Sequence, residues 1–343
     1  MNWNQRIKSL FWKIDDNGNQ PIHHIEIKPF ENEPTDFGDH RVDSAVKYHN
    51  DKWFHNELVV KAQHATVEPQ YAYAVNGLRS IIGASIRTRN NLPSPLPLIR
   101  SKLLHERAAL KKAVLFDGSM GGNYMHFFSD VFHKIYLLER FTELDCPILV
   151  GPAVFGKSMM GYIMKESPYR HLQWMCLKQP VLVEELWIAR PMPYKAEYFH
   201  RTKRFFIEKD LPRQQSKYIF LNRIGTSRCI LNFSEIQKVL ERNNVEVLAT
   251  EKLSMKEQAQ VFNLSARVIG IHGAAFTNLL YCNYAETKVL ELCSANRIGT
   301  QFYWLSTALG MDWNMMLGSD ADENQSFTLD PFEFERRLIE FLS

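Results

Sequence analysis

The segment RVIGIHGAAFTNLLYC, residues 267–282, has the residue types and spacing of an anion site. Its apolar run stops at His272 and continues with Gly273, Ala274 and Ala275. If a strand ends here and a helix begins, unpaired backbone amides and the helix dipole favour an anion, and the small side chains let a phosphate approach. Close packing of helix on strand would need the same small residues, and the segment lacks both GxGxxG and GxxxxGK[ST].

Two arginines and a glutamate stand at comparable places in the sequence. Arg223 and Arg228, in FLNRIGTSR, follow another apolar run, and guanidinium groups match phosphate oxygens well. Glu291 lies near the end of the apolar KVLELC, where a carboxylate accepts hydrogen bonds from ribose hydroxyls in other nucleotide sites. A solvated loop and an exposed strand end are the alternative interpretations. Together with His272, these residues predict a site for a nucleotide diphosphate.

The elements that would position these residues alternate between strand and helix. We expect strands at residues 217–222, 245–250, 267–271, 288–293 and 312–317, and helices at 232–244, 254–265, 274–282 and 300–311. Ser254 and Glu257 have the spacing of a capping box. The alternation predicts an α/β fold with a parallel sheet, which binds ligands beyond the carboxyl ends of its strands.

The pattern upstream of this region is less regular. Residues 111–119, 146–152 and 180–189 read as strands, and residues 121–141 read as one helix. The basic, Pro-containing stretch 190–206 reads as a connection between two domains. We therefore expect domains at residues 1–195 and 196–343, and residues 1–60 show too little periodicity to fix any element.

Composition limits the class of protein. A chain of 343 residues with 45% hydrophobic and 23% charged residues is typical of a two-domain globular protein. A net charge of +3 is too small to indicate nucleic acid as a partner. The five cysteines have no CxxC spacing, which argues against a disulfide framework or a cysteine zinc site. No run of ~18 apolar residues and no signal-peptide core is present, so we expect a cytoplasmic protein.

The chain resembles glycosyltransferase family 61 in three stretches that follow one another in the family's order. They are YIFLNRIGTSRCILN, the stretch from VEVLAT to LLYC, and KVLEL. The most specific element is HGA-x-x-TN. Upstream, NYMHFFSD is similar to the family's Asn-x-x-His segment with an acidic residue following. Residues 1–110 carry no resemblance, and Ala275 and Phe276 stand where relatives often have Gly-Leu.

The resemblance implies a GT-B architecture, in which two Rossmann-like domains with parallel sheets face a central cleft. The first domain would bind the acceptor and the second a nucleotide sugar, with the last helix free to pack back on the first domain. Family members are inverting transferases. The donor-binding residues that the resemblance implies are Asn123, Arg223, Arg228, His272, Gly273, Ala274, Asn278 and Glu291, with Glu291 at the ribose.

Inverting transfer needs a base for the acceptor hydroxyl. His126 and Asp130 are the candidates, because their spacing places both on one helix face. Asn123 would position the sugar or the acceptor, whereas His133 is expected to be packed or exposed. We expect a UDP-linked donor, no required metal, and a glycan or glycolipid acceptor in polysaccharide biosynthesis. Peripheral contact with the inner membrane surface is compatible with this function.

Other interpretations stay open. Asp320 and Asp322 in SDADEN have the DxD pattern that holds a metal in GT-A transferases, although an acidic solvated turn so near the C-terminus explains them too. His23 and His24 would indicate a metal only with acidic partners. A pyruvyltransferase-like enzyme on a GT-B scaffold, and a nucleotide-binding protein without catalysis, are the alternative functions.

Overall fold

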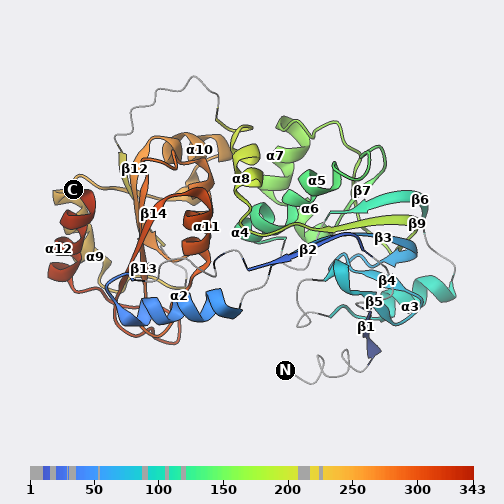
Figure 1. Cartoon of the computed structure of the whole chain (residues 1–343), viewed down its shortest axis with the longest axis horizontal. Coiled ribbons are helices and arrows are strands. Elements are labelled where there is room, and N and C mark those ends of the chain that lie inside the picture. The colour runs from blue at the N-terminus through green and yellow to red at the C-terminus, as the bar shows by residue number, and fades with distance from the viewer. Residues whose placement is uncertain are drawn as a thin grey trace. The chain divides into compact units, whose positions relative to one another are not determined.

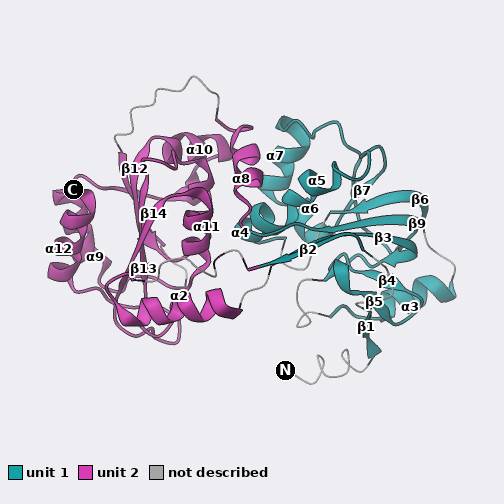
Figure 2. Ribbon diagram, in the orientation of Figure 1, with its two compact units in different colours: residues 1–27, 54–193 teal, residues 28–53, 194–343 magenta. Residues whose placement is uncertain are grey.

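The computed structural model describes residues 11–15, 21–28, 30, 36–52, 55–86, 92–104, 108–116, 121–207, 217–223 and 227–343 (Figure 1). The chain divides into two compact units (Figure 2). Unit 1 comprises residues 1–27 and 54–193, and unit 2 comprises residues 28–53 and 194–343. In the described residues, every helix is too short or too polar to cross a membrane.

Unit 2 is built on a parallel sheet, which in the described residues has five strands in the order β11-β10-β12-β13-β14. The strands are β10 (Lys217–Leu221), β11 (Glu246–Leu248), β12 (Ser265–Ile271), β13 (Lys288–Cys293) and β14 (Asp312–Leu317). All five were expected from the sequence. The strand order reverses between β10 and β12, and such a reversal opens a crevice beyond the carboxyl ends of the strands.

Helices cover both faces of this sheet (Figure 1). The helices of unit 2 are α2 (His40–Lys52), α8 (Ala196–Lys203), α9 (Phe233–Arg242), η3 (Thr250–Lys252), α10 (Met255–Asn263), η4 (Ala274–Tyr281), α11 (Gln301–Leu309) and α12 (Pro331–Leu342). The predicted capping box forms, since Ser254 accepts from the amide of Glu257 and the Glu257 carboxylate accepts from the amide of Ser254. The helix expected at residues 274–282 is the 3-10 helix η4.

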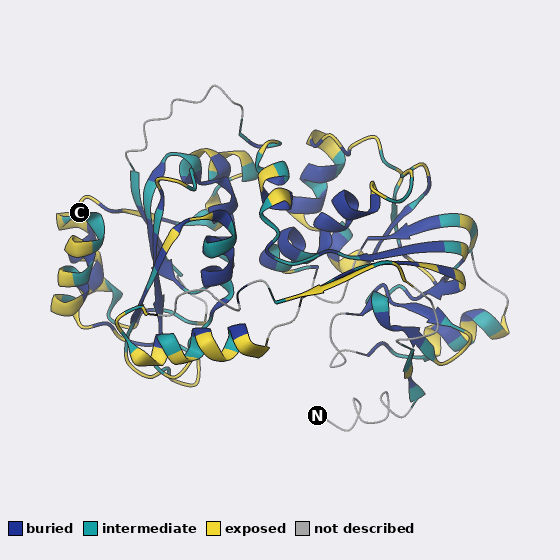
Figure 3. Cartoon of the chain, in the orientation of Figure 1, coloured by how far each residue is buried: buried dark blue, intermediate teal, exposed yellow. Residues whose placement is uncertain are grey.

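One face of the sheet packs against α9 and α12. Ile236 and Leu240 of α9 and Phe334 of α12 join the buried cluster around Ile269 of β12. Burying each such side chain stabilises the fold by about 1.5–3 kcal/mol. Helix α12 therefore packs on the sheet of unit 2. Figure 3 shows the outer faces of α2 and α12 exposed and the strands largely buried.

Helix α2 belongs to unit 2, although the predicted boundary assigned it to the first domain. The indole Nε1 of Trp304 donates to the buried Oδ1 of Asn50 at 2.7 Å, and Phe30 stacks on the same indole. On α2, Val42 and Val46 are also fully buried. These contacts join residues more than 250 positions apart in sequence, which local periodicity does not encode.

Unit 1 has a mixed sheet, not the parallel Rossmann-like sheet expected. Nine strands of the described residues form it: β1 (Lys13–Asp15), β2 (Pro21–Ile27), β3 (His55–Val67), β4 (Ala74–Asn76), β5 (Ser80–Ile82), β6 (Ala108–Leu115), β7 (Ile148–Val150), β8 (Trp174–Cys176) and β9 (Val181–Arg190). Strands β9, β6, β7 and β8 are parallel neighbours. The long strand β3 runs antiparallel to β9 and adds β2 and β4, also antiparallel, on its other side, whereas β1 at the edge pairs with β5 in parallel.

The helices of unit 1 include the predicted helix at residues 121–141. They are η1 (Gly83–Ser85), α3 (Leu96–Leu103), α4 (Tyr124–His126), η2 (Phe127–Val131), α5 (His133–Leu138), α6 (Pro152–Phe155) and α7 (Ser158–Glu166). Segment η2 is π-helical, and in it the amide of Phe132 bonds to the carbonyl of Phe127 at 2.7 Å. Such π turns are frequent at functional sites.

Candidate functional site

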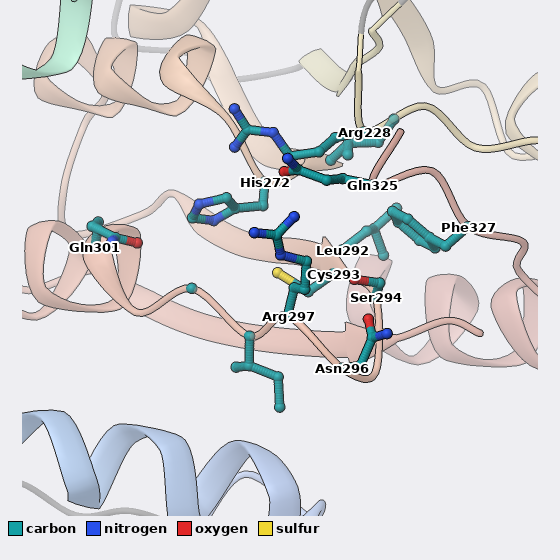
Figure 4. Close-up of a pocket in the computed structure, with 13 residues that line it drawn as sticks. Arg228, His272, Leu292, Cys293, Ser294, Asn296, Arg297, Gln301, Gln325 and Phe327 are labelled. Carbon is teal, nitrogen blue, oxygen red and sulfur yellow. The ribbon is translucent and has the colours of Figure 1, made fainter. Parts of the chain in front are cut away.

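A pocket of about 400 Å³ lies beyond the carboxyl ends of β12 and β13 (Figure 4). The residues lining it are Arg228, Ile271, His272, Leu292, Cys293, Ser294, Asn296, Arg297, Ile298, Gly299, Gln301, Gln325 and Phe327. The lining contains two arginines and no aspartate or glutamate. In Figure 4 the side chains of Arg228, His272 and Arg297 extend into the same part of the pocket. The charge of the pocket is thus suited to an anion.

Arg228 is held in a strained backbone conformation. Its φ is +67°, a region that side-chain-bearing residues rarely adopt, and Gln325 opposite has φ +64°. Backbone bonds join the two loops, since the amide of Arg228 donates to the carbonyl of Asn324 at 3.1 Å and that of Phe327 donates to Cys229 at 3.0 Å. Strain of about 1–3 kcal/mol per residue persists where a function requires the geometry.

Arg223 follows β10 and lies against the start of η4. A Cβ added to Gly273 would collide with the guanidinium of Arg223, so only glycine permits this approach. The Nε of Arg223 donates to the carbonyl of Ser227 at 3.2 Å. Burial, and then the neighbouring charge of Arg228, lower the pKa of Arg223. The two cations therefore repel each other in a partly desolvated place.

No carboxylate in the described part of the chain forms an ion pair with Arg223, Arg228 or Arg297, whereas surface arginines such as Arg242 and Arg336 are paired. The Nε of Arg228 is moreover buried without a hydrogen-bond partner among the described residues. A buried unpaired charge is costly, and a bound anion would offset that cost. This group of arginines is the strongest sign of a ligand site in unit 2.

His272 is oriented by a buried carboxylate. Its Nδ1 lies 2.5 Å from Oε1 of Glu291, and the indole Nε1 of Trp313 donates to Oε2 at 3.0 Å. The Glu291 side chain is fully buried, and both of its oxygens are used. Gly299 closes over the imidazole, because a Cβ there would collide with the ring. With Nδ1 facing the carboxylate, Nε2 is the ring nitrogen left for a ligand.

In the structure Glu291 contacts His272, whereas the sequence predicted that it binds the ribose. This buried carboxylate holds His272 through one oxygen and Trp313 through the other, and its role at the ribose stays a prediction. Asn278 is also buried, and its Nδ2 donates to Oε1 of Gln258 at 2.8 Å, which anchors η4 on α10. Ala274 is the first residue of η4, and neither Ala274 nor Asn278 lines the pocket.

His272, Glu291 and Cys293 have ligand atoms within 4.8 Å of one another, the spacing that a metal ion needs. Burial, and then the charge of Glu291, raise the pKa of the Cys293 thiol. A protonated thiol and a carboxylate engaged on both oxygens are poor metal ligands.

The DxD pair, Asp320 and Asp322, is exposed, and Oδ1 of Asp322 accepts from the amide of Ser326 at 2.8 Å, as in an ordinary acidic turn.

Several pocket residues were not predicted from the sequence. Arg297 carried a usable signal, because it follows β13 closely, just as Arg223 follows β10. Gln325 carried no such signal in the sequence, since the loop that brings it to the pocket lies beyond β14.

His23, in unit 1, bonds to Oε1 of the buried Glu57 at 3.0 Å, and that carboxylate also pairs with Arg140.

Unit 1 contains the second candidate group, a histidine–aspartate pair. The Nδ1 of His126 lies 2.8 Å from Oδ2 of Asp130, and both side chains are partly exposed. Asn123 caps the helix, because its Oδ1 accepts from the amides of Met125 and His126. His133 is fully buried, and burial lowers its pKa to about 3. Of the two histidines on this helix, His126 is the one that solvent reaches.

Comparison with known proteins identifies the family. The model of the family described as Glycosyltransferase 61 matches residues 124–290, which include the His126–Asp130 pair, Arg223, Arg228 and His272. A search of curated protein sequences finds no match. The matched range contains most of the residues whose geometry is described above, although it ends just before Glu291 and Arg297. The chain belongs to glycosyltransferase family 61 and is a glycosyltransferase.

Proposed function

We propose that this glycosyltransferase is an inverting enzyme of GT-B type that moves a sugar from a UDP-sugar to a hydroxyl group of a glycan. The observation that carries the proposal is the group of Arg223, Arg228 and Arg297 near His272, an arginine group that has no carboxylate partner among the described residues. A nucleotide diphosphate supplies the negative charge that this group lacks.

The arginines have two tasks in this mechanism. In the ground state each contributes a charge-assisted hydrogen bond, worth about 1.5–3 kcal/mol, to a phosphate oxygen. As the bond between the anomeric carbon and the phosphate oxygen breaks, the leaving diphosphate gains negative charge, which the same cations stabilise. Because side chains provide this positive charge, we expect the transfer to proceed without a required metal.

His272 supplies a further contact to the donor. The Glu291 carboxylate fixes the orientation of the imidazole and accepts from Nδ1. The opposite nitrogen, Nε2, then bonds to a diphosphate oxygen when it carries a proton. Glu291 acts here as a positioning residue.

His126 and Asp130 are the proposed base. Asp130 accepts from Nδ1 and orients the ring, and Nε2 of His126 takes the proton of the acceptor hydroxyl. The freed oxygen attacks the anomeric carbon from the face opposite the diphosphate, so one carbon–oxygen bond forms as the other breaks and the configuration inverts. This role requires the two units to meet at a GT-B cleft when both substrates are bound.

Membership of the family supports the choice of acceptor class. We propose a glycan or glycolipid hydroxyl, polysaccharide biosynthesis as the process, and the cytoplasmic face of the inner membrane as the location.

The experiment that tests the function is a turnover screen with the full chain. UDP-sugars, GDP-sugars and phosphoenolpyruvate are offered with a glycan acceptor, and NMR reads the anomeric configuration of the product. We expect a UDP-sugar to give a product of inverted configuration, with the same rate in the presence of EDTA. Retention of configuration, or binding of phosphoenolpyruvate alone, would contradict the proposal.

A further inference from the structure

We infer that helix α3 and the turn between β4 and β5 form a surface that docks on a lipid bilayer with anionic headgroups. The leucine surface, as we name it, consists of Leu78, Leu96, Leu103 and Leu104. It lies in unit 1, and the inference stands independently of the donor and acceptor proposed above.

The first observation is the exposure of these four leucines. Their exposed fractions run from 50% at Leu78 to 73% at Leu103. Among the described residues only one other leucine, Leu231, is exposed to this degree. Isolated exposed leucines are common in soluble proteins, but a concentration of them on one element and its neighbour marks an interaction site.

The fold explains why these leucines face outward. On α3, Leu96, Arg100 and Leu103 follow the spacing of one helix face and are all exposed. The opposite face carries Leu98, which is buried in a cluster with Trp12. That second face already fixes the helix, so the core of unit 1 does not need the outward leucines.

A hydrogen bond joins the turn to the helix. The Nζ of Lys102 donates to the carbonyl of Gly77, the residue before Leu78. Leu78 is therefore held close to the end of α3 where Leu103 and Leu104 lie. We therefore take the four exposed leucines together as one surface, of the kind that inserts shallowly among lipid headgroups.

Charge decides between a bilayer and a protein partner. Residues 69–105 contain five arginines and lysines and no aspartate or glutamate. Three of these cations, Arg79, Arg100 and Lys102, are on the described turn and helix. Exposed leucines beside these three cations match an anionic leaflet, to which each basic residue near the surface adds attraction. A protein surface complementary to this region would have to be unusually acidic.

Sedimentation of the full chain with lipid vesicles tests the inference. We expect the chain to bind phosphatidylcholine vesicles that contain phosphatidylglycerol, and to bind vesicles of phosphatidylcholine alone at least tenfold more weakly. The double variant Leu96→Ser, Leu103→Ser should lose most of this binding. The matched control Leu231→Ser, at the exposed leucine of unit 2, should bind as the wild type does.

A second pair of variants isolates charge. Arg100→Gln should weaken vesicle binding about fivefold, the effect of one cation near an anionic surface. The control Lys238→Gln removes an exposed cation of α9 and should leave binding unchanged. All five substituted positions are exposed, so the thermal midpoints of the variants should equal that of the wild type.

Direct insertion has its own readout. In Leu103→Trp, the added indole emission should shift to shorter wavelength and be quenched by brominated lipid on vesicle binding, whereas Leu231→Trp should show neither change. Equal binding to neutral and anionic vesicles would overturn the inference, as would an absence of vesicle binding. Dimerisation that Leu96→Ser, Leu103→Ser abolishes, with no vesicle binding, would instead assign the surface to a second copy of the chain.

Discussion

The arginine group of unit 2 and the histidine–aspartate pair of unit 1 differ in whether their side chains have a partner of opposite charge. In unit 2, Arg223 and Arg228 lie together beside a pocket without a carboxylate partner among the described residues. In unit 1, His126 is bonded to Asp130 at 2.8 Å. The first arrangement is incomplete until an anion arrives, and the second has an internal partner for its ring proton.

This difference separates binding from proton transfer. An unpaired cluster of like charge gains most from a ligand of the opposite charge, so it should govern donor affinity. A histidine paired with a carboxylate has a fixed ring orientation for exchanging a proton, so it should govern turnover. Variants of the two groups should therefore affect different kinetic constants.

The largest effect is expected in unit 1. Because general base catalysis contributes about 10²- to 10⁴-fold, His126→Ala should lower kcat by about that factor and leave UDP affinity unchanged. Asp130→Asn should show a smaller loss of the same kind. Steady-state kinetics and calorimetry measure the two quantities, with His24→Ala, at an exposed histidine, as the control. Normal turnover in both variants would remove the proposed base.

The next effect concerns affinity. Arg228→Ala should weaken UDP binding about 10- to 150-fold, because a charge-assisted contact worth about 1.5–3 kcal/mol is lost. Calorimetry with UDP measures the change. Arg242→Ala serves as control, since Arg242 is exposed on α9 and paired with Glu335 at 2.9 Å. An equal loss of affinity in the control would show that the effect is not specific to the pocket.

His133 sharpens the contrast with His126 on the same helix. Burial lowers the pKa of His133 to about 3 from 6.5, so below pH 6.5 the unfolded chain binds a proton that the folded chain does not. The free energy of unfolding should then fall by about 1.4 kcal/mol per pH unit, or about 2 kcal/mol by pH 5. Urea unfolding of His133→Phe should show a shallower dependence on pH in this range. A slope as steep as that of the wild type would contradict the assignment.

The smallest effect tests how His272 is held. In Gly299→Ala the added Cβ meets the imidazole, so UDP affinity should fall by about fivefold or more, as overpacking costs about 1 kcal/mol or more. Gly161→Ala on α7 is the matched control, because a Cβ there meets open space. Calorimetry should find the control unchanged in UDP affinity.

The sequence predicted unit 2 far better than unit 1. Strands β13 and β14 form over the predicted residues 288–293 and 312–317, because each is an apolar run bounded by turn residues. Helix α2 was missed, since only Val42, Val46 and Asn50 of its 13 residues are buried, too narrow a stripe to read as periodic. The antiparallel part of the unit 1 sheet depends on pairing between β3 and β9, which are distant in sequence.

The candidate site was predictable to a similar extent. Arg223, Arg228 and His272 follow strands that periodicity locates, so their approach to one sheet edge could be inferred. Gln325 enters through a later loop, and the bond between Glu291 and His272 depends on two neighbouring strands in register. The sequence thus predicted correctly that Glu291 lies at the carboxyl edge of the sheet, whereas its hydrogen bond to His272 was found only in the structure.

The central claim is that unpaired arginines bind the diphosphate, and the preference for UDP over uridine tests it most directly. Calorimetry compares both ligands on the wild type and on the double variant Arg223→Ala, Arg228→Ala. We predict that the wild type binds UDP much more tightly than uridine, and that the variant loses this preference while its uridine affinity stays the same. A variant that still prefers UDP by the wild-type ratio would contradict the claim.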